Sequence, residues 1–235
     1  MKKTALILLF ACIFFSSCKD NSIKYNGPDV INIVLREEFD LNASSQDPLS
    51  YHSDNERNVT VSPNGVIYGK NVGEANVTIS NTEKQLSIPV IVSLFEEPTL
   101  KFGASTKEIK ALYGEPKHNL GDSVYIYGSG QDWYSWAAWE MDFFFNDDHY
   151  YESNIYIRND LELLLNKYLD ENYFFNKILT DTIDGEERTL YIYLDNKNPN
   201  DAKVIVGKQY NAGPYKDILL VYAPSDALNI ASRRK

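Results

Sequence analysis

The stretch Val59–Ser80, VTVSPNGVIYGKNVGEANVTIS, decides the fold that we expect for the first part of the chain. Apolar and polar residues alternate at its start and again from Ala75 to Ser80, and this period of two indicates half-buried β-strands. Pro63-Asn64-Gly65 and the segment from Gly69 to Gly73 contain the residues that tight turns favour. Three short strands so closely spaced, with no helical period, predict an antiparallel all-β module.

This segment resembles the group 2 bacterial immunoglobulin-like domain. Tyr51 stands where that family usually has a tryptophan, and a V-x-V-x-x-x-G hairpin with further glycines follows it. The matching residues are Val59, Val61, Asn64, Gly65, Gly69, Gly73 and Ala75. The resemblance implies an immunoglobulin-like β-sandwich at residues 29–94. It also implies a role as a spacer or adhesive module, which members of the family usually have on bacterial surface proteins.

The N-terminus has the composition of an export signal. Two lysines precede an apolar run, Ala5–Phe15, that is too short to span a bilayer. The residues Phe15-Ser16-Ser17-Cys18 resemble the lipobox of bacterial lipoproteins, which implies cleavage after residue 17 and a lipid on the sulfur of Cys18. The alternative is an ordinary signal peptide with an incidental cysteine. We therefore expect a signal peptide at residues 1–17 and a tether at residues 18–28.

The residues after the lipobox bear on localisation. Lys19-Asp20-Asn21 resembles the short charged signals that direct Bacteroidetes-type lipoproteins to the cell surface. The alternative is an anchor that faces the periplasm. In both cases the expected location is the outer membrane of the cell envelope, and the membrane is reached through the lipid on Cys18.

The net charge of −10 over 235 residues restricts the partners. We expect no nucleic acid, because its phosphates require a basic surface. Both cysteines, Cys12 and Cys18, lie in or next to the export signal, so the rest of the chain can form no disulfide and no cysteine-bound metal site. The three histidines lack metal-ligand spacing, and no nucleotide-binding or nucleophile motif occurs. We expect no metal and no cofactor.

Beyond the junction at Leu94–Pro98, residues 98–228 have a mixed pattern, which predicts an α+β domain with an antiparallel sheet. Ser105-x-x-Glu108 is a capping box at the start of a helix, and Asn159-x-x-Glu162 is a second capping candidate. The expected strands are Val124–Tyr127, Trp139–Phe145, Asn154–Ile157, Thr189–Leu194, Ala202–Tyr210 and Asp217–Tyr222. In the second strand, Trp139 and Met141 fall in phase, which predicts that both point into the core.

The order helix, strand, strand, strand thus occurs twice, at residues 98–157 and 159–224. A true duplication and the accidental recurrence of a common pattern both explain it. A tandem αβββ arrangement resembles the fold of β-lactamase inhibitor protein and its small outer-membrane lipoprotein relatives. The resemblance implies that helices pack on one face of the sheet and that the opposite face can bind protein.

The three tryptophans are clustered in sequence. Trp133, Tyr134 and Trp136 follow a glycine-rich loop, and exposed rings beside carboxylates and amides stack on sugars or anchor partner proteins. These three residues are our candidate ligand-binding residues. The alternative is a buried aromatic cluster, which we expect for Trp139.

Two triplets resemble the O-glycosylation sequon of Bacteroidetes, in which an aspartate precedes a serine or threonine and an apolar residue. They are Asp122-Ser123-Val124 and Asp181-Thr182-Ile183. The resemblance implies that Ser123 and Thr182 accept sugars if the protein is exported. Otherwise they are ordinary turn or strand-edge residues.

Together these patterns predict a multidomain protein, an all-β immunoglobulin-like sandwich followed by an α+β domain. Because no catalytic motif occurs, we expect a protein that is not an enzyme and that binds a glycan or another envelope protein, with the sandwich as a spacer. A structural envelope component without a specific ligand is the first alternative. A carbohydrate-acting hydrolase, which would need two carboxylates across a cleft, is the second.

Overall fold

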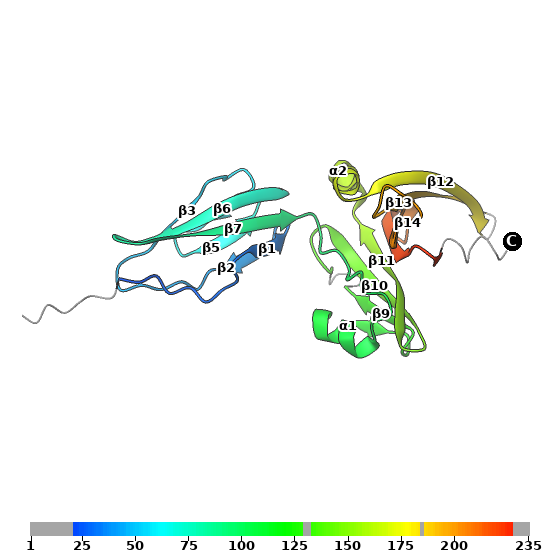
Figure 1. Cartoon of the computed structure of the whole chain (residues 1–235), viewed down its shortest axis with the longest axis horizontal. Coiled ribbons are helices and arrows are strands. Elements are labelled where there is room, and N and C mark those ends of the chain that lie inside the picture. Colours follow the sequence, from blue (N-terminus) through cyan, green and yellow to red (C-terminus); the bar gives the residue numbers. More distant parts are fainter. Residues whose placement is uncertain (1–20, 129–132, 184–185, 228–235) are drawn as a thin grey trace, which may run out of the picture.

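The computed structural model describes residues 21–128, 133–183 and 186–227, so the predicted lipidation site Cys18 and the signal peptide lie outside the described residues. The described chain is mostly β-strand, arranged in three sheets with little helix. We call residues 21–94 the N-terminal part and the described residues from 95 to 227 the C-terminal part. Figure 1 shows the two parts at opposite ends of an elongated molecule.

Two sheets form the N-terminal part. Its strands are β1 (Ile31–Val34), β2 (Glu38–Asp40), β3 (Ser50–Ser53), β4 (Val59–Val61), β5 (Val66–Gly69), β6 (Gly73–Ser80) and β7 (Gln85–Ser93). One sheet has the order β1-β7-β6-β3 and the other β2-β5-β4, and β1 alone among the described strands of this part pairs parallel to its neighbour. The strands predicted within Val59–Ser80 are confirmed as β4, β5 and β6.

The alternation in β6 has the expected consequence. Ala75, Val77 and Ile79 are buried and the polar residues between them are not, so β6 turns one face to the core between the two sheets. The turn between β4 and β5 depends on Gly65, whose φ is +82°. A Cβ there would lie 2.8 Å from Cζ of Tyr51. Glycine therefore lets the β3 tyrosine pack over the turn.

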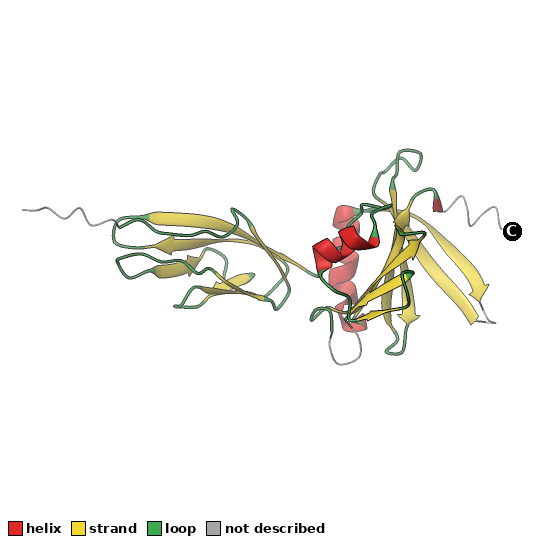
Figure 2. Cartoon of the chain, turned by 90° about the horizontal axis from the view of Figure 1, so that it is seen from below, coloured by secondary structure: helices red, strands yellow, loops and turns green. Residues whose placement is uncertain are grey.

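One eight-stranded antiparallel sheet and two α-helices form the C-terminal part. The helices are α1 (Thr106–Tyr113) and α2 (Glu162–Asn172), which follows a 3₁₀ turn at Asn159–Leu161. The strands are β8 (His118–Asn119), β9 (Val124–Tyr127), β10 (Ala138–Asn146), β11 (His149–Ile157), β12 (Phe174–Ile183), β13 (Glu186–Leu194), β14 (Val204–Ala212) and β15 (Asp217–Pro224). Figure 2 shows both helices on the side of the sheet that faces the N-terminal part.

The strand order β12-β13-β14-β15-β11-β10-β9-β8 divides into two mirrored halves. Each helix is followed by four strands, and the last strand of each half, β11 or β15, pairs with the other at the centre of the sheet. The expectation of three strands after each helix omitted the two-residue β8 and the ten-residue β12. β12 follows α2 almost at once, and the register shift between Phe175 and Lys177 interrupts its alternation, so its sequence lacks a strand pattern.

A β-bulge in β10 places Trp139 on the opposite face from Met141. The register with β11 shifts between Ala138 and Glu140. Trp139 therefore packs against Tyr156, with ring centroids 4.9 Å apart, and lies outside the core cluster that contains Met141. The predicted burial of Trp139 is confirmed, since the residue is 5% exposed, but its predicted direction is wrong. One extra residue inverts the alternation, and residue types alone do not reveal it.

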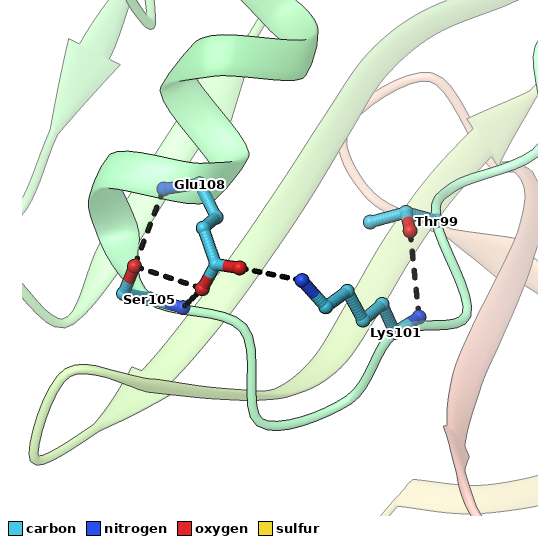
Figure 3. Close-up of polar contacts among 4 residues, drawn as sticks. All are labelled: Thr99, Lys101, Ser105 and Glu108. Atoms are coloured by element: carbon cyan, nitrogen blue, oxygen red, sulfur yellow. Dashed lines mark hydrogen bonds and ion pairs between the residues drawn. The ribbon is translucent and has the colours of Figure 1, made fainter.

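The predicted capping box at the start of α1 is confirmed. The Ser105 hydroxyl accepts a hydrogen bond from the amide of Glu108, and the Glu108 carboxylate accepts one from the amide of Ser105 at 3.0 Å (Figure 3). Lys101 Nζ lies 2.5 Å from the same carboxylate. These hydrogen bonds, that of Lys101 first, lower the pKa of Glu108 to about 2.

The second capping candidate is wrong. Asn159 opens a 3₁₀ turn, its side chain donates to the carbonyl of Lys216, and no side chain caps α2. The Glu162 carboxylate accepts from the Tyr210 hydroxyl at 2.8 Å instead. Polar partners from β14 and the loop before β15 thus replace the local cap.

Replacement of Ser105 by alanine is expected to lower the free energy of unfolding by about 1 kcal/mol, because an amide of the first turn loses its acceptor. Urea denaturation of the variant measures this loss. Lys107→Ala, at an exposed position in the same helix, is the control and should have almost no effect. Equal effects of the two substitutions would contradict the role of the cap.

Candidate functional site

A cavity of about 670 Å³ lies where the N-terminal and C-terminal parts meet. Its wall comes from β1 and the end of β7, from the segment after β7, from the residues before β10 and from α2. The lining residues are Asn32, Ile33, Val34, Glu37, Ser93, Phe95, Glu96, Glu97, Tyr134, Ser135, Tyr168 and Asn172. We call this space the junction cavity. Within this lining there are three carboxylates and no lysine, arginine or histidine.

The segment after β7 is held by apolar packing. Leu94 and Phe95 are buried in the continuous core that includes residues of both parts. The ring of Phe95 meets the ring of Tyr168 on α2 edge-on, with centroids 4.9 Å apart. Because this packing fixes Leu94 and Phe95, the next two residues, Glu96 and Glu97, have defined positions at the cavity wall.

Tyrosine hydroxyls hold these two glutamates. The Tyr134 hydroxyl donates to Oε2 of Glu96. The hydroxyls of Tyr168, at 2.6 Å, and of Tyr173 both donate to Oε1 of Glu97. Burial, and then the neighbouring carboxylate, raise the pKa of each of the three tyrosines, so all three remain neutral donors. Three hydroxyls from the C-terminal part thereby fasten the segment that leaves the N-terminal part.

A row of alternating cations and rings crosses the same junction. The guanidinium of Arg36, from the turn after β1, lies 4.0 Å from the ring centroid of Trp136. The guanidinium of Arg158 lies 4.5 Å from the ring of Trp136 and 5.7 Å from that of Trp133. Arg158 also makes two hydrogen bonds to Asp160, at 2.9 and 2.6 Å. We call this row the Arg–Trp ladder, and it links the two parts through cation–π contacts.

Local backbone geometry sets the position of the ladder. Arg36 has a φ of +69°, and its amide donates to the carbonyl of Gly69 at 2.7 Å, which fixes the turn after β1. On the other side, the amide of Tyr134 donates to the carbonyl of Trp139 at 3.1 Å. Gly128 lies against this loop with a φ of +75°, and a Cβ there would be 2.4 Å from that same carbonyl oxygen. Only glycine permits this approach.

The three candidate ligand-binding residues therefore come together at the junction. Trp133 is 43% exposed, whereas Trp136 and Tyr134 are partly buried against the core. Tyr134 lines the junction cavity, and the two tryptophans belong to the ladder beside it. The sequence did not point to Arg36 or Arg158 as partners of these rings, because their contacts depend on tertiary structure.

The two candidate O-glycosylation residues lie elsewhere. Ser123 is exposed in the turn before β9, and its carbonyl accepts from the amide of Phe145 at 2.8 Å. Thr182 lies in β12, where it is paired with Glu187 of β13. Neither residue lines the junction cavity.

A second cluster of acids lies on the sheet face opposite to the helices, at alternate positions of β10 and β11. Asp142 is 6% exposed, and burial, followed by the charge of Glu140, raises the pKa of its carboxyl to about 8. Burial also raises the pKa of Glu140 and Glu152. Asn154 is the cross-strand neighbour of Asp142, and Oδ1 of each lacks a hydrogen-bond partner among the described residues. A protonated Asp142 can donate to Asn154 and satisfy both.

The described residues contain no group of three histidine, cysteine, aspartate or glutamate side chains that could hold a metal ion. Within the same residues, no helix is both long and apolar enough to cross a membrane. The lining of the junction cavity offers carboxylate acceptors, neutral tyrosine hydroxyls and aromatic rings.

No protein-family model matches the chain, and no curated protein matches it. Among solved structures, a termite-gut GH10 xylanase with a bacterial Ig-like domain has 17% identity and a TM-score of 0.27 over 34% of this chain and 22% of its own. Domains 5–6 of the S-layer protein SbsC have 10% identity and a TM-score of 0.27, over 88% of this chain and 96% of their own.

Human protocadherin-24 EC1-2 has 11% identity and a TM-score of 0.28, over 87% of this chain and 96% of its own. The match to the xylanase covers only 22% of the length of that protein. Structural similarity at these TM-scores defines neither the fold nor the function of this chain.

Proposed function

We propose that the protein is a lipid-anchored protein of the cell envelope that binds a neutral polyhydroxylated ligand, a glycan, in the junction cavity. The observation that carries this proposal is the lining of the cavity, which joins carboxylate acceptors to aromatic rings and contains no cationic side chain. Binding is non-covalent in this proposal, and the protein is not an enzyme.

The chemistry of the lining supports this class of ligand. The lining contains three carboxylates and no basic side chain, so charge repulsion disfavours an anionic ligand. Carboxylate oxygens accept hydrogen bonds from sugar hydroxyls, and tyrosine and tryptophan rings stack on the apolar faces of sugars. In Glu96 and Glu97 the tyrosine hydroxyls approach one carboxylate oxygen each, so the second oxygen is the acceptor that we assign to the ligand.

In this proposal the cavity lies away from the membrane. Cys18 carries the lipid, residues 18–28 form the tether, and residues 29–94 form an immunoglobulin-like sandwich that acts as a spacer. Residues 98–228 form an α+β domain of the tandem type, and the mirrored order of its strands supports a duplication. Outer-membrane attachment, at the cell surface or facing the periplasm, belongs to the same proposal.

A structural role in the envelope is the second candidate, and the Arg–Trp ladder favours it. The ladder and the tyrosine–glutamate bonds fix the two parts to each other. A rigid rod of this kind needs no ligand. Ligand binding therefore has to be tested against this alternative.

The test uses the chain from Lys19 onward, without lipid, titrated calorimetrically with a panel of neutral and acidic glycans. Asn32 lines the junction cavity from an exposed position of β1, so Asn32→Tyr is expected to obstruct the cavity and to abolish binding while leaving the fold intact. Gln85→Tyr, exposed at the distant end of β7, is the matched control and should bind like the native chain. The proposal would be contradicted if the native chain bound no glycan, or if Asn32→Tyr bound a glycan as tightly as the native chain.

A further inference from the structure

The first described residues of the chain are held against the N-terminal part. Asn21 is 8% exposed, and its carbonyl accepts a hydrogen bond from the side-chain amide of Asn81 at 2.7 Å. Ile23 packs against the core. Lys24 and Ser44 exchange two backbone hydrogen bonds, at 2.8 and 3.0 Å. The chain is therefore fixed to the N-terminal part from Asn21 onward.

The same contacts define one end of the N-terminal part. Asn81 opens the turn between β6 and β7, and its side-chain amide also donates to the hydroxyl of Ser45 at 2.8 Å. We call residues 21–24, 44–47 and 81–84 the end surface. β7 begins beside this surface and ends at the junction with the C-terminal part (Figure 1). Because β7 contains nine residues at about 3.3 Å each, the end surface and the junction lie about 30 Å apart.

The predicted lipidation site is close to the end surface in sequence. Cys18 precedes Asn21 by three residues. An extended chain spans at most about 3.6 Å per residue, so the Cα atoms of these two residues lie no more than about 11 Å apart. This limit holds for every conformation of the residues between them. Of the tether predicted at residues 18–28, only the part before Asn21 can separate the lipid from the fold.

We propose that the end surface lies against the lipid headgroups of the membrane that holds the anchor. The N-terminal part then stands on the bilayer, and β7 holds the junction cavity about 30 Å above the headgroups. This inference rests on the lipid anchor of the proposed function, and it is independent of ligand binding in the junction cavity. It assigns a membrane partner to one defined surface of the fold.

The composition of the end surface fits a contact with headgroups. It contains two lysines, Lys24 and Lys84, and two acids, Asp47 and Glu83, so its formal net charge is zero, whereas the whole chain carries −10. Anionic headgroups repel an acidic surface, and a surface without net charge avoids this repulsion. Ile23 is the only apolar residue of the end surface, and it packs against the core. The end surface therefore rests on the headgroups and does not insert among the acyl chains.

Fluorescence quenching tests the contact on the full chain, purified with its lipid and reconstituted in phosphatidylcholine vesicles. Lys84→Cys lies on the end surface, and Lys70→Cys, after β5, is the matched control at the junction end. Both lysines are exposed, and each variant carries one fluorophore on the introduced thiol. Nitroxide-labelled headgroups should quench the label at position 84. They should leave the label at position 70 unquenched, because the length of β6 separates the two positions.

A longer anchor tests whether the short connection holds the end surface in place. An insertion of about twelve glycine and serine residues between Asp20 and Asn21 adds a flexible coil with a mean span of about 20 Å. The insertion changes none of the described contacts. It should remove most of the quenching at position 84 while the protein stays bound to the vesicles.

Flotation of the vesicles separates failure of this inference from failure of the anchor. A chain that does not float with the vesicles carries no lipid, and this result would overturn the proposed anchor and the inference together. A chain that floats would overturn the inference alone if the label at position 84 were not quenched, if both positions were quenched equally, or if the insertion left the quenching unchanged. Circular dichroism establishes that each variant is folded.

Discussion

Asp142→Asn is expected to stabilise the protein at alkaline pH and to have little effect at acid pH. Asp142 is 6% exposed, and its ionised form would be a buried charge without a cationic partner among the described residues. Burial, and then the charge of Glu140, raise its pKa from 3.8 to about 8. Asn is neutral at every pH, and its amide can donate to the opposed Asn154 as a protonated Asp142 would.

The direction of the pH dependence follows from proton linkage. Between about pH 4 and about pH 8 the folded carboxyl retains a proton that the unfolded chain has lost. The native chain therefore loses stability as the pH rises through this range. Below about pH 4 the Asp142 carboxyl is protonated in both states and does not affect stability. Above about pH 8 it is ionised in both states, and the folded state bears the full cost of burying the charge. Each pH unit corresponds to about 1.4 kcal/mol, so the penalty is at most about 6 kcal/mol.

Urea denaturation across this pH range measures the effect. The free energy of unfolding of Asp142→Asn should fall less steeply with pH than that of the native chain, so that the two curves diverge toward pH 8. Glu38→Gln, at an exposed strand position, is the control and should follow the native curve. Parallel curves for Asp142→Asn and the native chain would show that the carboxyl is not protonated in the fold.

Trp136→Ala is expected to lower the free energy of unfolding by about 2–3 kcal/mol. The substitution removes a half-buried ring and two cation–π contacts, to Arg36 at 4.0 Å and to Arg158 at 4.5 Å. Trp133→Ala removes one longer contact, at 5.7 Å, from a ring that is 43% exposed, and should cost less than about 1 kcal/mol. Thermal unfolding followed by circular dichroism compares the two variants.

A double-mutant cycle isolates the contact across the junction. Arg36→Ala and Trp136→Ala should together cost less than the sum of the single substitutions, by about 1 kcal/mol. Arg57→Ala, exposed on the loop before β4, is the control for Arg36 and should be additive with Trp136→Ala. Additivity of the Arg36 pair would show that the ladder does not couple the two parts.

Much of the strand content could be predicted because the alternation is local. The strands within Val59–Ser80 and the capping box at Ser105 follow from neighbouring residues, whose preferences agree with the fold. β12 could not be predicted in this way, since the irregular register at Phe175 and Lys177 removes the period of two. A β-bulge of the same kind turned the side chain of Trp139 to the opposite face of β10, although the alternation of the neighbouring residues predicted the face of Met141.

The candidate site could be predicted only in part. The sequence clustering pointed to the junction for Trp133 and Trp136, whose rings both lie against Arg158 there, but not for Trp139. The sequence predicted Glu96 and Glu97 only as part of the junction between the two domains, not as acceptors of hydrogen bonds from tyrosines. Their hydroxyl donors lie 38, 71 and 76 residues away in sequence. Contacts over such distances depend on the packing of α2 and on the loop before β10, which local patterns do not specify.

The most direct test of the junction cavity as a ligand site uses the three indole N–H signals in the nuclear magnetic resonance spectrum. Trp133 and Trp136 lie in the ladder beside the cavity, whereas Trp139 packs against Tyr156 on the far face of the sheet. On addition of a bound glycan, the signals of Trp133 and Trp136 should shift in a saturable manner and that of Trp139 should not. A saturable shift of Trp139 alone, or no shift of any signal across the glycan panel, would contradict the account.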